Sequence, residues 1–326
     1  RAAEKPEENK KNEQSVMKIG FFGTPEIGAY CMKALFDEFE VLCAVTGPDK
    51  KSGRNREVHF SSVKEAALAR NIPVLQPEKL RDGAFLNELK SFGADIYVVV
   101  AYGKIIPREV FDQPRYKTIN LHPSLLPKYR GAAPIQWALV HGEKETGITV
   151  QCINEELDAG DILMQETIAL DESMTAEDLY QAVLPAGADL LIKTLHGLQD
   201  GSVVPVPQDH GTASYCGKID RDTARINWDS SALDIHNLVR GFNPKPVAWT
   251  AFRGKNMRVW KTMTFSDSVD FMLRPGEVRG FQKKRLLAGT GEGIIEIISI
   301  QPENKKSMEG LAFINGYRLV EGESFG

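Results

Sequence analysis

The segment KIGFFGTPEIGAYCMKALFDEFEVLCAVTG, residues 18–47, predicts a strand, a helix and a second strand in succession. Its opening KIGFFG is a mostly apolar run that ends in Gly23, which is typical of a short buried strand. A helical pattern follows from Pro25, a residue that is well tolerated in the first turn of a helix. Two strands joined by a helix predict parallel pairing, the unit from which α/β domains are built.

The same alternation continues to about residue 200. Further helices are expected at 61–71, 83–94, 133–143 and 175–201, and further strands at 95–101, 117–122, 147–153 and 161–170. We therefore predict an α/β fold with a Rossmann-like first domain, whose mostly parallel sheet has helices on both faces. Ligands of such sheets bind at the carboxyl ends of the strands, where Gly23, Tyr102–Lys104 and Asn120–His122 are expected to lie.

After Gly201 the pattern changes to a Pro- and Gly-rich stretch, then one helix and several short strands with Gly turns. Such strands predict a small β-barrel, similar to an OB-fold. The expected domains are a catalytic domain at 17–205, a linker at 206–217 and a C-terminal β-barrel domain at 218–326. Residues 1–16 are polar and without apolar period, so we interpret them as a tail or an expression remnant before a natural start at Met17.

Composition narrows the class of protein. The chain has 326 residues, 42% of them hydrophobic, and no apolar run approaches the ~20 residues of a membrane helix. Four cysteines occur singly, which predicts reduced thiols and a cytoplasmic location. The few histidines lack metal-ligand spacing, so no metal is expected. We expect a monomer.

Three polar residues form the candidate catalytic set. Asn120 and His122 end the strand at 117–122, and period-2 alternation places both side chains on one face. Asp158 precedes Ala-Gly in ELDAGDIL, a turn that can present a carboxylate to a cleft. No nucleophile motif and no dinucleotide fingerprint accompany them. Such a set can polarise a carbonyl, stabilise an oxyanion and move a proton, which favours transfer of a small group between two bound substrates.

Two basic regions suggest a polyanionic partner. The loop GPDKKSGRNREVHF, residues 47–60, is longer than the ~2–6 residues usual after a strand in this fold. A second cluster of basic residues, which includes Arg253, Lys255 and Arg258, lies between Trp249 and Trp260 in the sequence. A mobile charged loop and a solvated hairpin are the alternatives. The candidate residues for binding this polyanion are Lys50, Lys51, Arg54, Arg56, Lys255 and Arg258.

The run NLHPSLLPKYRGAAPIQWAL, with ETGITV and LDAGDIL downstream, closely resembles the formyltransferases that use 10-formyltetrahydrofolate. The resemblance implies that Asn120, His122 and Asp158 are catalytic, and that 10-formyltetrahydrofolate is the formyl donor. It also implies a folate site bordered by the SLLP segment. The candidate folate-binding residues are Ser124, Leu125, Leu126, Pro127, Tyr102 and Gly103.

Members of this family differ in their acceptor. FFGTPEIGA, TGPDKKSGR and the C-terminal IDRDTARINWDSSALDIHNLVRGFNPKP resemble those members that formylate methionyl initiator tRNA for translation initiation, although Lys245 stands where they usually have Trp. The resemblance implies that the α-amine of methionine is the acceptor and that Arg54 meets the acceptor stem. It also implies that the candidate basic residues and the C-terminal β-barrel domain bind tRNA. The alternatives are a sugar-nucleotide formyltransferase, a formyltetrahydrofolate hydrolase, and a tRNA-binding module with a decayed site.

Overall fold

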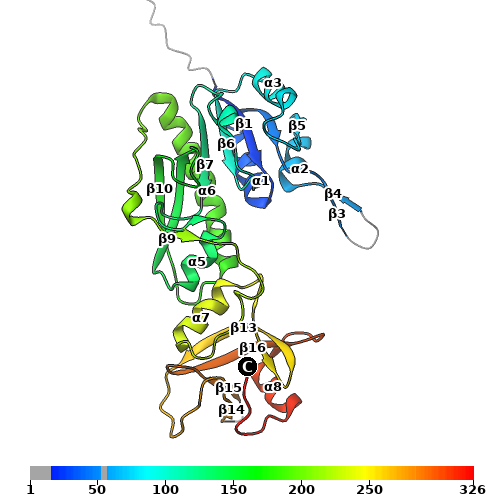
Figure 1. Ribbon diagram of the computed structural model, residues 1–326, viewed down its shortest axis with the longest axis vertical. Helices are drawn as coiled ribbons and strands as arrows, with labels where there is room; N and C mark the ends of the chain where they lie inside the picture. The colour runs from blue at the N-terminus through cyan, green and yellow to red at the C-terminus, as the bar shows by residue number, and fades with distance from the viewer. Residues whose placement is uncertain (1–15, 53–56, 283) are drawn as a thin grey trace, which may run out of the picture. The chain divides into compact units, whose positions relative to one another are not determined.

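The computed structural model describes residues 16–52, 57–282 and 284–326. The chain divides into two compact units, Arg1–Thr118 and Ile119–Gly326. Each unit is described by itself, and Figure 1 gives the element labels.

The first unit is built on parallel strands in the order β6-β1-β2-β5. These strands are β1 (Lys18–Gly23), β2 (Glu40–Val45), β5 (Val74–Leu75) and β6 (Ile96–Val100). Four helices belong to it: α1 (Glu26–Leu35), α2 (Ser62–Leu68), α3 (Gly83–Ser91) and the short α4 (Arg108–Phe111). Apolar side chains on β1 and β6 are buried because helices cover the sheet. Ser61 caps α2 by accepting a hydrogen bond from the Lys64 amide at 3.1 Å, as its sequence position predicts.

A small hairpin interrupts this unit between β2 and α2. It consists of β3 (Lys50–Ser52) and β4 (Glu57–His59), which pair antiparallel. Its base is tied to the unit, because Lys64 donates to Asp49 at 2.7 Å and stacks over the Phe60 ring at 4.1 Å. The predicted basic loop is therefore a hairpin with an anchored base.

The second unit begins with three antiparallel strands in the order β10-β9-β7. They are β7 (Thr118–His122), β9 (Glu145–Cys152) and β10 (Ile162–Ala169). The long helix α6 (Ala176–Asp200) lies along β9 and β10 (Figure 1). Another helix, α5 (Pro134–Val140), follows the two-residue strand β8 (Arg130–Gly131).

The segment 206–217 contains η1 (His210–Thr212) and β11 (Tyr215–Cys216). Strand β11 pairs in parallel with β8, placing Tyr215 beside Arg130 and Cys216 beside Gly131. The segment predicted as a linker is therefore packed against the loop that follows β7.

The remaining chain forms an antiparallel sheet domain. Its strands run in the order β12-β13-β16-β15-β14, with β17 paired to β16. Its elements are α7 (Ala232–Gly241), β12 (Ala248–Phe252), β13 (Lys255–Phe265), β14 (Val278–Phe281), β15 (Arg285–Gly289), β16 (Ile294–Pro302), β17 (Met308–Glu309) and α8 (Gly310–Tyr317). Trp228, Phe252 and Phe313 are buried in its core. The predicted order, an α/β part with a mostly parallel sheet followed by a C-terminal domain of antiparallel strands, is confirmed.

No helix among the described residues has the length and apolar character that crossing a membrane requires.

Candidate active site

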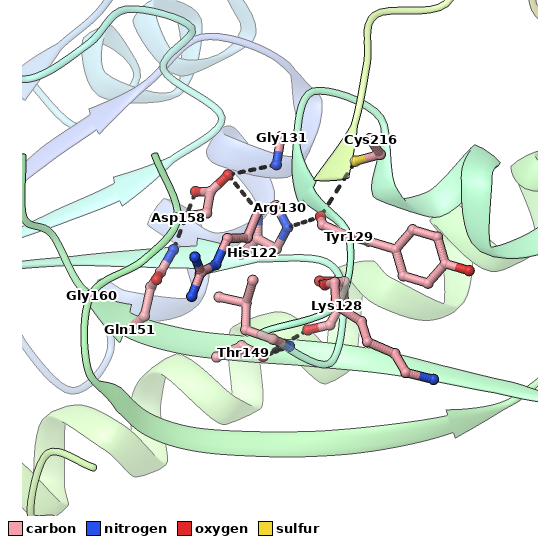
Figure 2. A network of polar contacts seen from close by, with 12 residues as sticks. His122, Lys128, Tyr129, Arg130, Gly131, Thr149, Gln151, Asp158, Gly160 and Cys216 are labelled. Carbon is pink, nitrogen blue, oxygen red and sulfur yellow. Dashed lines mark hydrogen bonds and ion pairs between the residues drawn. The ribbon is translucent and has the colours of Figure 1, made fainter. Parts of the chain in front are cut away.

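His122, at the carboxyl end of β7, is buried and oriented by the backbone. Its Nε2 lies 2.9 Å from the carbonyl oxygen of Tyr129. A carbonyl can only accept, so Nε2 carries a proton and donates it to this bond. The Cys216 thiol donates to the same oxygen at 3.3 Å. The other ring nitrogen, Nδ1, faces Oδ2 of Asp158 at 3.7 Å (Figure 2).

Asp158 lies on a turn with φ +52° and is held through both carboxylate oxygens. Oδ2 accepts from the Gly131 amide at 2.9 Å, and Oδ1 accepts from Nε2 of Gln151 at 3.2 Å (Figure 2). Both donors are protein groups, so the carboxylate plane is fixed before any substrate binds. The structure therefore brings the predicted His122 and Asp158 together.

Gly131 is required by the pairing of β8 with β11. Its φ is +121°, and a Cβ at this position would lie 2.2 Å from the carbonyl oxygen of Cys216. Only glycine allows this approach and this backbone conformation together. The same close approach aims the Gly131 amide at Asp158.

Asn120 lies opposite Gln151 in the pairing of β7 with β9, two residues before His122 and on the same face. Its side chain is half-buried and makes no hydrogen bond to any of the residues that the structure describes. An amide with two free donors at a strand end suits a ligand oxygen.

The predicted folate-border segment Ser124–Pro127 is fixed by side chains of neighbouring strands. Thr149 Oγ1 donates to the Ser124 carbonyl at 2.7 Å and accepts from the Leu126 amide at 3.1 Å. Gln165 Nε2 donates to the Leu126 carbonyl at 2.9 Å. The loop that contains Leu125 thus has a defined backbone without a bound ligand.

Tyr102 and Gly103 belong to the first unit. The Tyr102 ring packs edge-on against Phe22, with centroids 5.6 Å apart. Its hydroxyl is buried and, among the described residues, has no hydrogen-bond partner. Burial raises the pKa of this phenol to about 12, so the group is a neutral donor. A buried, unpaired hydroxyl is a group that a ligand could satisfy.

The predicted tRNA-binding residues differ in what is known of them. Lys50 and Lys51 lie on β3, but their side chains are outside the description, and Arg54 and Arg56 lie outside the described residues. Lys255 and Arg258 are exposed on β13. Arg258 lines a cavity of about 610 Å³ in the C-terminal domain.

Sequence reasoning missed most of this cavity. Trp249 lines it, with the guanidinium of Arg221 5.0 Å and that of Arg225 5.5 Å from the ring centroid. The Asn256 Oδ1 on its wall is buried and, within the described ranges, has no donor. The cavity combines cations, an aromatic face and an unpaired acceptor, a combination suited to nucleic acid.

Sequence reasoning also missed three polar residues that are connected to Asp158 by hydrogen bonds, because Gln151, Gln208 and Arg130 belong to no local motif. Cys216, another missed neighbour, is not a nucleophile. Chiefly burial, and then the charge of Asp158, raise the pKa of its thiol, which stays protonated as a donor to the Tyr129 carbonyl. Among the described residues, no group of three or more His, Cys, Asp or Glu side chains could hold a metal ion.

Comparisons with known proteins agree along nearly the whole chain. The formyl transferase family model matches residues 17–195, and that of the formyl transferase C-terminal domain matches residues 218–318. The methionyl-tRNA formyltransferase of Thermodesulfovibrio yellowstonii is 42% identical over 305 residues, covering 93% of this chain and 97% of its own. The methionyl-tRNA formyltransferase of Acetivibrio thermocellus is 40% identical over 311 residues, covering 95% of this chain and 100% of its own.

Solved structures share the fold at lower identity. WlaRD, a sugar 3N-formyl transferase solved in the presence of dTDP and 5-N-formyl-THF, has a TM-score of 0.65 at 20% identity, covering 89% of this chain and 99% of its own. HypX from Aquifex aeolicus, in complex with tetrahydrofolic acid, has a TM-score of 0.60 at 18% identity, covering 95% of this chain and 49% of its own.

Proposed function

The chain belongs to the methionyl-tRNA formyltransferases of the formyl transferase family, and on this premise we propose that Asn120, His122 and Asp158 transfer a formyl group from 10-formyltetrahydrofolate to the α-amine of methionyl initiator tRNA. The product is formylmethionyl-tRNA, and the cytoplasm, where translation begins, is its proposed location. One observation carries the assignment of the site. The free amide of Asn120 lies on one strand face with a histidine whose open nitrogen faces a fixed carboxylate.

The chemistry follows from these groups. The amine nitrogen attacks the formyl carbon, and the carbonyl oxygen becomes an oxyanion that the Asn120 amide stabilises by hydrogen bonding. The bond from the formyl carbon to N10 then breaks. One amine proton must leave the nucleophile and one must reach N10, so the net proton change is zero. Nδ1 of His122 and Oδ2 of Asp158 are the groups placed to relay this proton.

Two features support the folate site. Thr149 and Gln165 fix the backbone of the Ser124–Pro127 segment, and its partly exposed side chains, Leu125 and Pro127, are the ones proposed to border a flat ring system. The unpaired hydroxyl of Tyr102 is a second candidate contact, beside Gly103 with φ +82°. We propose these residues as contacts of the donor.

The acceptor site is supported by charge and shape. The cavity beside Arg258 and Trp249 offers a cation for phosphate and an aromatic face for a base. Lys255 lies on β13 with Arg258, and Lys50, Lys51, Arg54 and Arg56 are the proposed contacts from the basic segment 47–60 of the sequence. We propose both regions as tRNA contacts.

The test is a transfer assay with labelled methionyl initiator tRNA and 10-formyltetrahydrofolate, with a control that lacks tRNA. We expect formylmethionyl-tRNA to form only when both substrates are present. Release of formate without formylated tRNA would instead identify a hydrolase. Formylation of an amino sugar nucleotide in place of tRNA would reject the acceptor.

A further inference from the structure

The guanidinium of Arg130 is buried, with the residue 1% exposed, beside the candidate active site. Its Nε and Nη2 donate to Oε1 of Gln208 at 3.1 and 2.7 Å. Its Nη1 contacts the hydroxyl of Tyr215 at 3.3 Å and Nδ1 of His210 at 3.4 Å. It forms no ion pair with a carboxylate in the described part of the chain. Burying a cation without an anion is costly, so this arrangement needs a reason beyond packing.

Because a guanidinium can only donate, it fixes the orientation of the next amide. Gln208, which is 5% exposed, must turn its oxygen toward Arg130 and its Nε2 away. That Nε2 approaches Oε1 of Gln151 at 3.1 Å, and the backbone carbonyls of Asp158 at 3.0 Å and Gly160 at 2.7 Å. All three of these atoms are acceptors.

The donor-to-acceptor direction set by Arg130 extends through Gln151 to the carboxylate of Asp158. The oxygen of Gln151 is occupied by Gln208, so its Nε2 must point to Oδ1 of Asp158. The Gly131 amide donates to Oδ2. Both oxygens therefore accept, and a proton on Oδ1 would require reversing the whole chain of amides. Each donor at the end of this chain is directed at one oxygen of Asp158, so the chain fixes the orientation of the carboxylate.

We propose that Gln208, with Gln151 and Arg130, is a positioning residue that forms a one-way hydrogen-bond relay and holds Asp158 as an oriented carboxylate. The proposal rests on the proposed role of Asp158 in proton transfer. It means that the segment predicted as a linker supplies part of the active site, because Gln208, His210 and Tyr215 all come from it.

The decisive variant is Gln208→Glu, which preserves size and gives Arg130 an ion-pair partner. Its second oxygen faces acceptors only, so Gln151 must turn over and present its own oxygen to Asp158. We expect kcat to fall about 10- to 100-fold, part of the ~10²–10⁴ that a positioned proton-transfer group supplies. KM for both substrates should stay within about 2-fold. The acid limb of the kcat profile should move to higher pH, because the reversed Gln151 amide places an acceptor oxygen against Asp158 and so favours a proton between them.

The matched control is Gln165→Glu. Gln165 also donates its Nε2 to a backbone carbonyl and to a hydroxyl, and within the described ranges it makes no hydrogen bond to Asp158 or Gln151. We expect it to raise KM for the folate donor and to leave the acid limb in place. An equal shift of the limb in both variants would overturn the relay, as would normal kcat and an unmoved limb in Gln208→Glu.

Two further variants complete the test. Circular dichroism checks that Gln208→Glu folds. If it does not fold, Gln151→Glu tests the relay instead, because this variant keeps Gln208 and Arg130 paired. We expect Gln151→Glu to move the acid limb of the kcat profile in the same direction. Asp158→Asn separates the two proposals. Full activity in Asp158→Asn would reject the proposed role of Asp158, whereas an inactive Asp158→Asn beside a normal Gln208→Glu would reject only the relay.

Discussion

Nδ1 of His122 and Oδ2 of Asp158 lie 3.7 Å apart, too far for a hydrogen bond, while Nε2 of the same ring is 2.9 Å from the Tyr129 carbonyl. The imidazole is therefore oriented by the backbone, and its open nitrogen points to the carboxylate. A proton placed between these two atoms can be shared with a substrate, because among the described residues Nδ1 makes no hydrogen bond and Oδ2 accepts only from the Gly131 amide. The site is thus arranged for proton transfer at Nδ1.

Asn120→Ala should lower kcat for formyl transfer by about 10²–10³, the usual cost of losing one oxyanion donor. The amide has no side-chain partner among the described residues, so the melting temperature should change little. Transfer kinetics and thermal unfolding check this. Asn315→Ala, at an exposed position on α8, is the control. Near-normal turnover in Asn120→Ala would remove Asn120 from the mechanism.

Gly131→Ala should abolish most activity and destabilise the protein. The added methyl would lie 2.2 Å from the Cys216 carbonyl oxygen, and alanine would have to adopt a φ of +121°. Strand β8 must therefore move, which takes the amide of residue 131 away from Asp158. Strain of this kind costs of order 1–3 kcal/mol. Gly316→Ala, where a Cβ meets nothing within 4 Å, is the matched control. Equal activity and equal melting temperatures in the two variants would contradict this account.

The placement of the three candidate catalytic residues was largely predictable because it depends on local sequence pattern. Period-2 alternation placed Asn120 and His122 on one face, and the turn around Asp158 presented its carboxylate, as the structure has them. The resemblance to the formyltransferases is confirmed by both family models. These features are encoded over a few residues each.

Tertiary contacts were not predictable. Arg130 and Gln208 are 78 positions apart, and nothing near either residue indicates the pair. Pro- and Gly-rich sequence around Gln208 is typical of a connection, but the hydrogen bonds of β11 with β8 give it a fixed place. Likewise, Trp249 and Arg221 meet only when the C-terminal domain folds. Long-range polar pairs leave no period in a sequence.

Arg54→Ala should raise KM for methionyl-tRNA and leave KM for the folate donor unchanged, because the contact proposed for Arg54 is to a phosphate of the tRNA. Loss of one such contact should reduce the slope of log affinity against log salt by about 0.7–0.9. Titration of tRNA binding at several salt concentrations measures it. Lys90→Ala, an exposed cation on α3, is the control. Equal loss of folate and tRNA binding would count against a tRNA contact.

Arg258→Ala should weaken tRNA binding in the same way and leave turnover at saturating tRNA unchanged, because the residue lines the C-terminal cavity and not the catalytic site. Trp249→Leu should also weaken binding, but with the salt slope preserved, since stacking on a base is not ionic. Lys306→Ala, exposed outside the cavity, is the comparison. Unchanged tRNA affinity in both cavity variants would exclude this cavity from the interface.

His236 on α7 offers a test of stability against pH. Its Nε2 lies 3.1 Å from the Glu172 carbonyl and its Nδ1 3.0 Å from the Thr262 hydroxyl. Nε2 carries the proton of the neutral ring and donates it in a hydrogen bond to the carbonyl, so Nδ1 accepts a hydrogen bond from the Thr262 hydroxyl. Burial lowers the pKa of this histidine, and the nearby charge of Arg240 acts in the same direction, although Glu172 opposes it.

Because the folded pKa of His236 is lowered, the unfolded chain binds this proton first as pH falls below about 6.5. The free energy of unfolding must then decrease with falling pH over the window between the unfolded and folded pKa values. His236→Gln can make both hydrogen bonds but cannot titrate, so its stability should fall less from about pH 6.5 to 5. Urea unfolding at several pH values measures the difference from the parent. His59→Gln, at an exposed position on β4, should keep the parent's slope. A parent-like slope in His236→Gln would show that other groups cause the acid sensitivity.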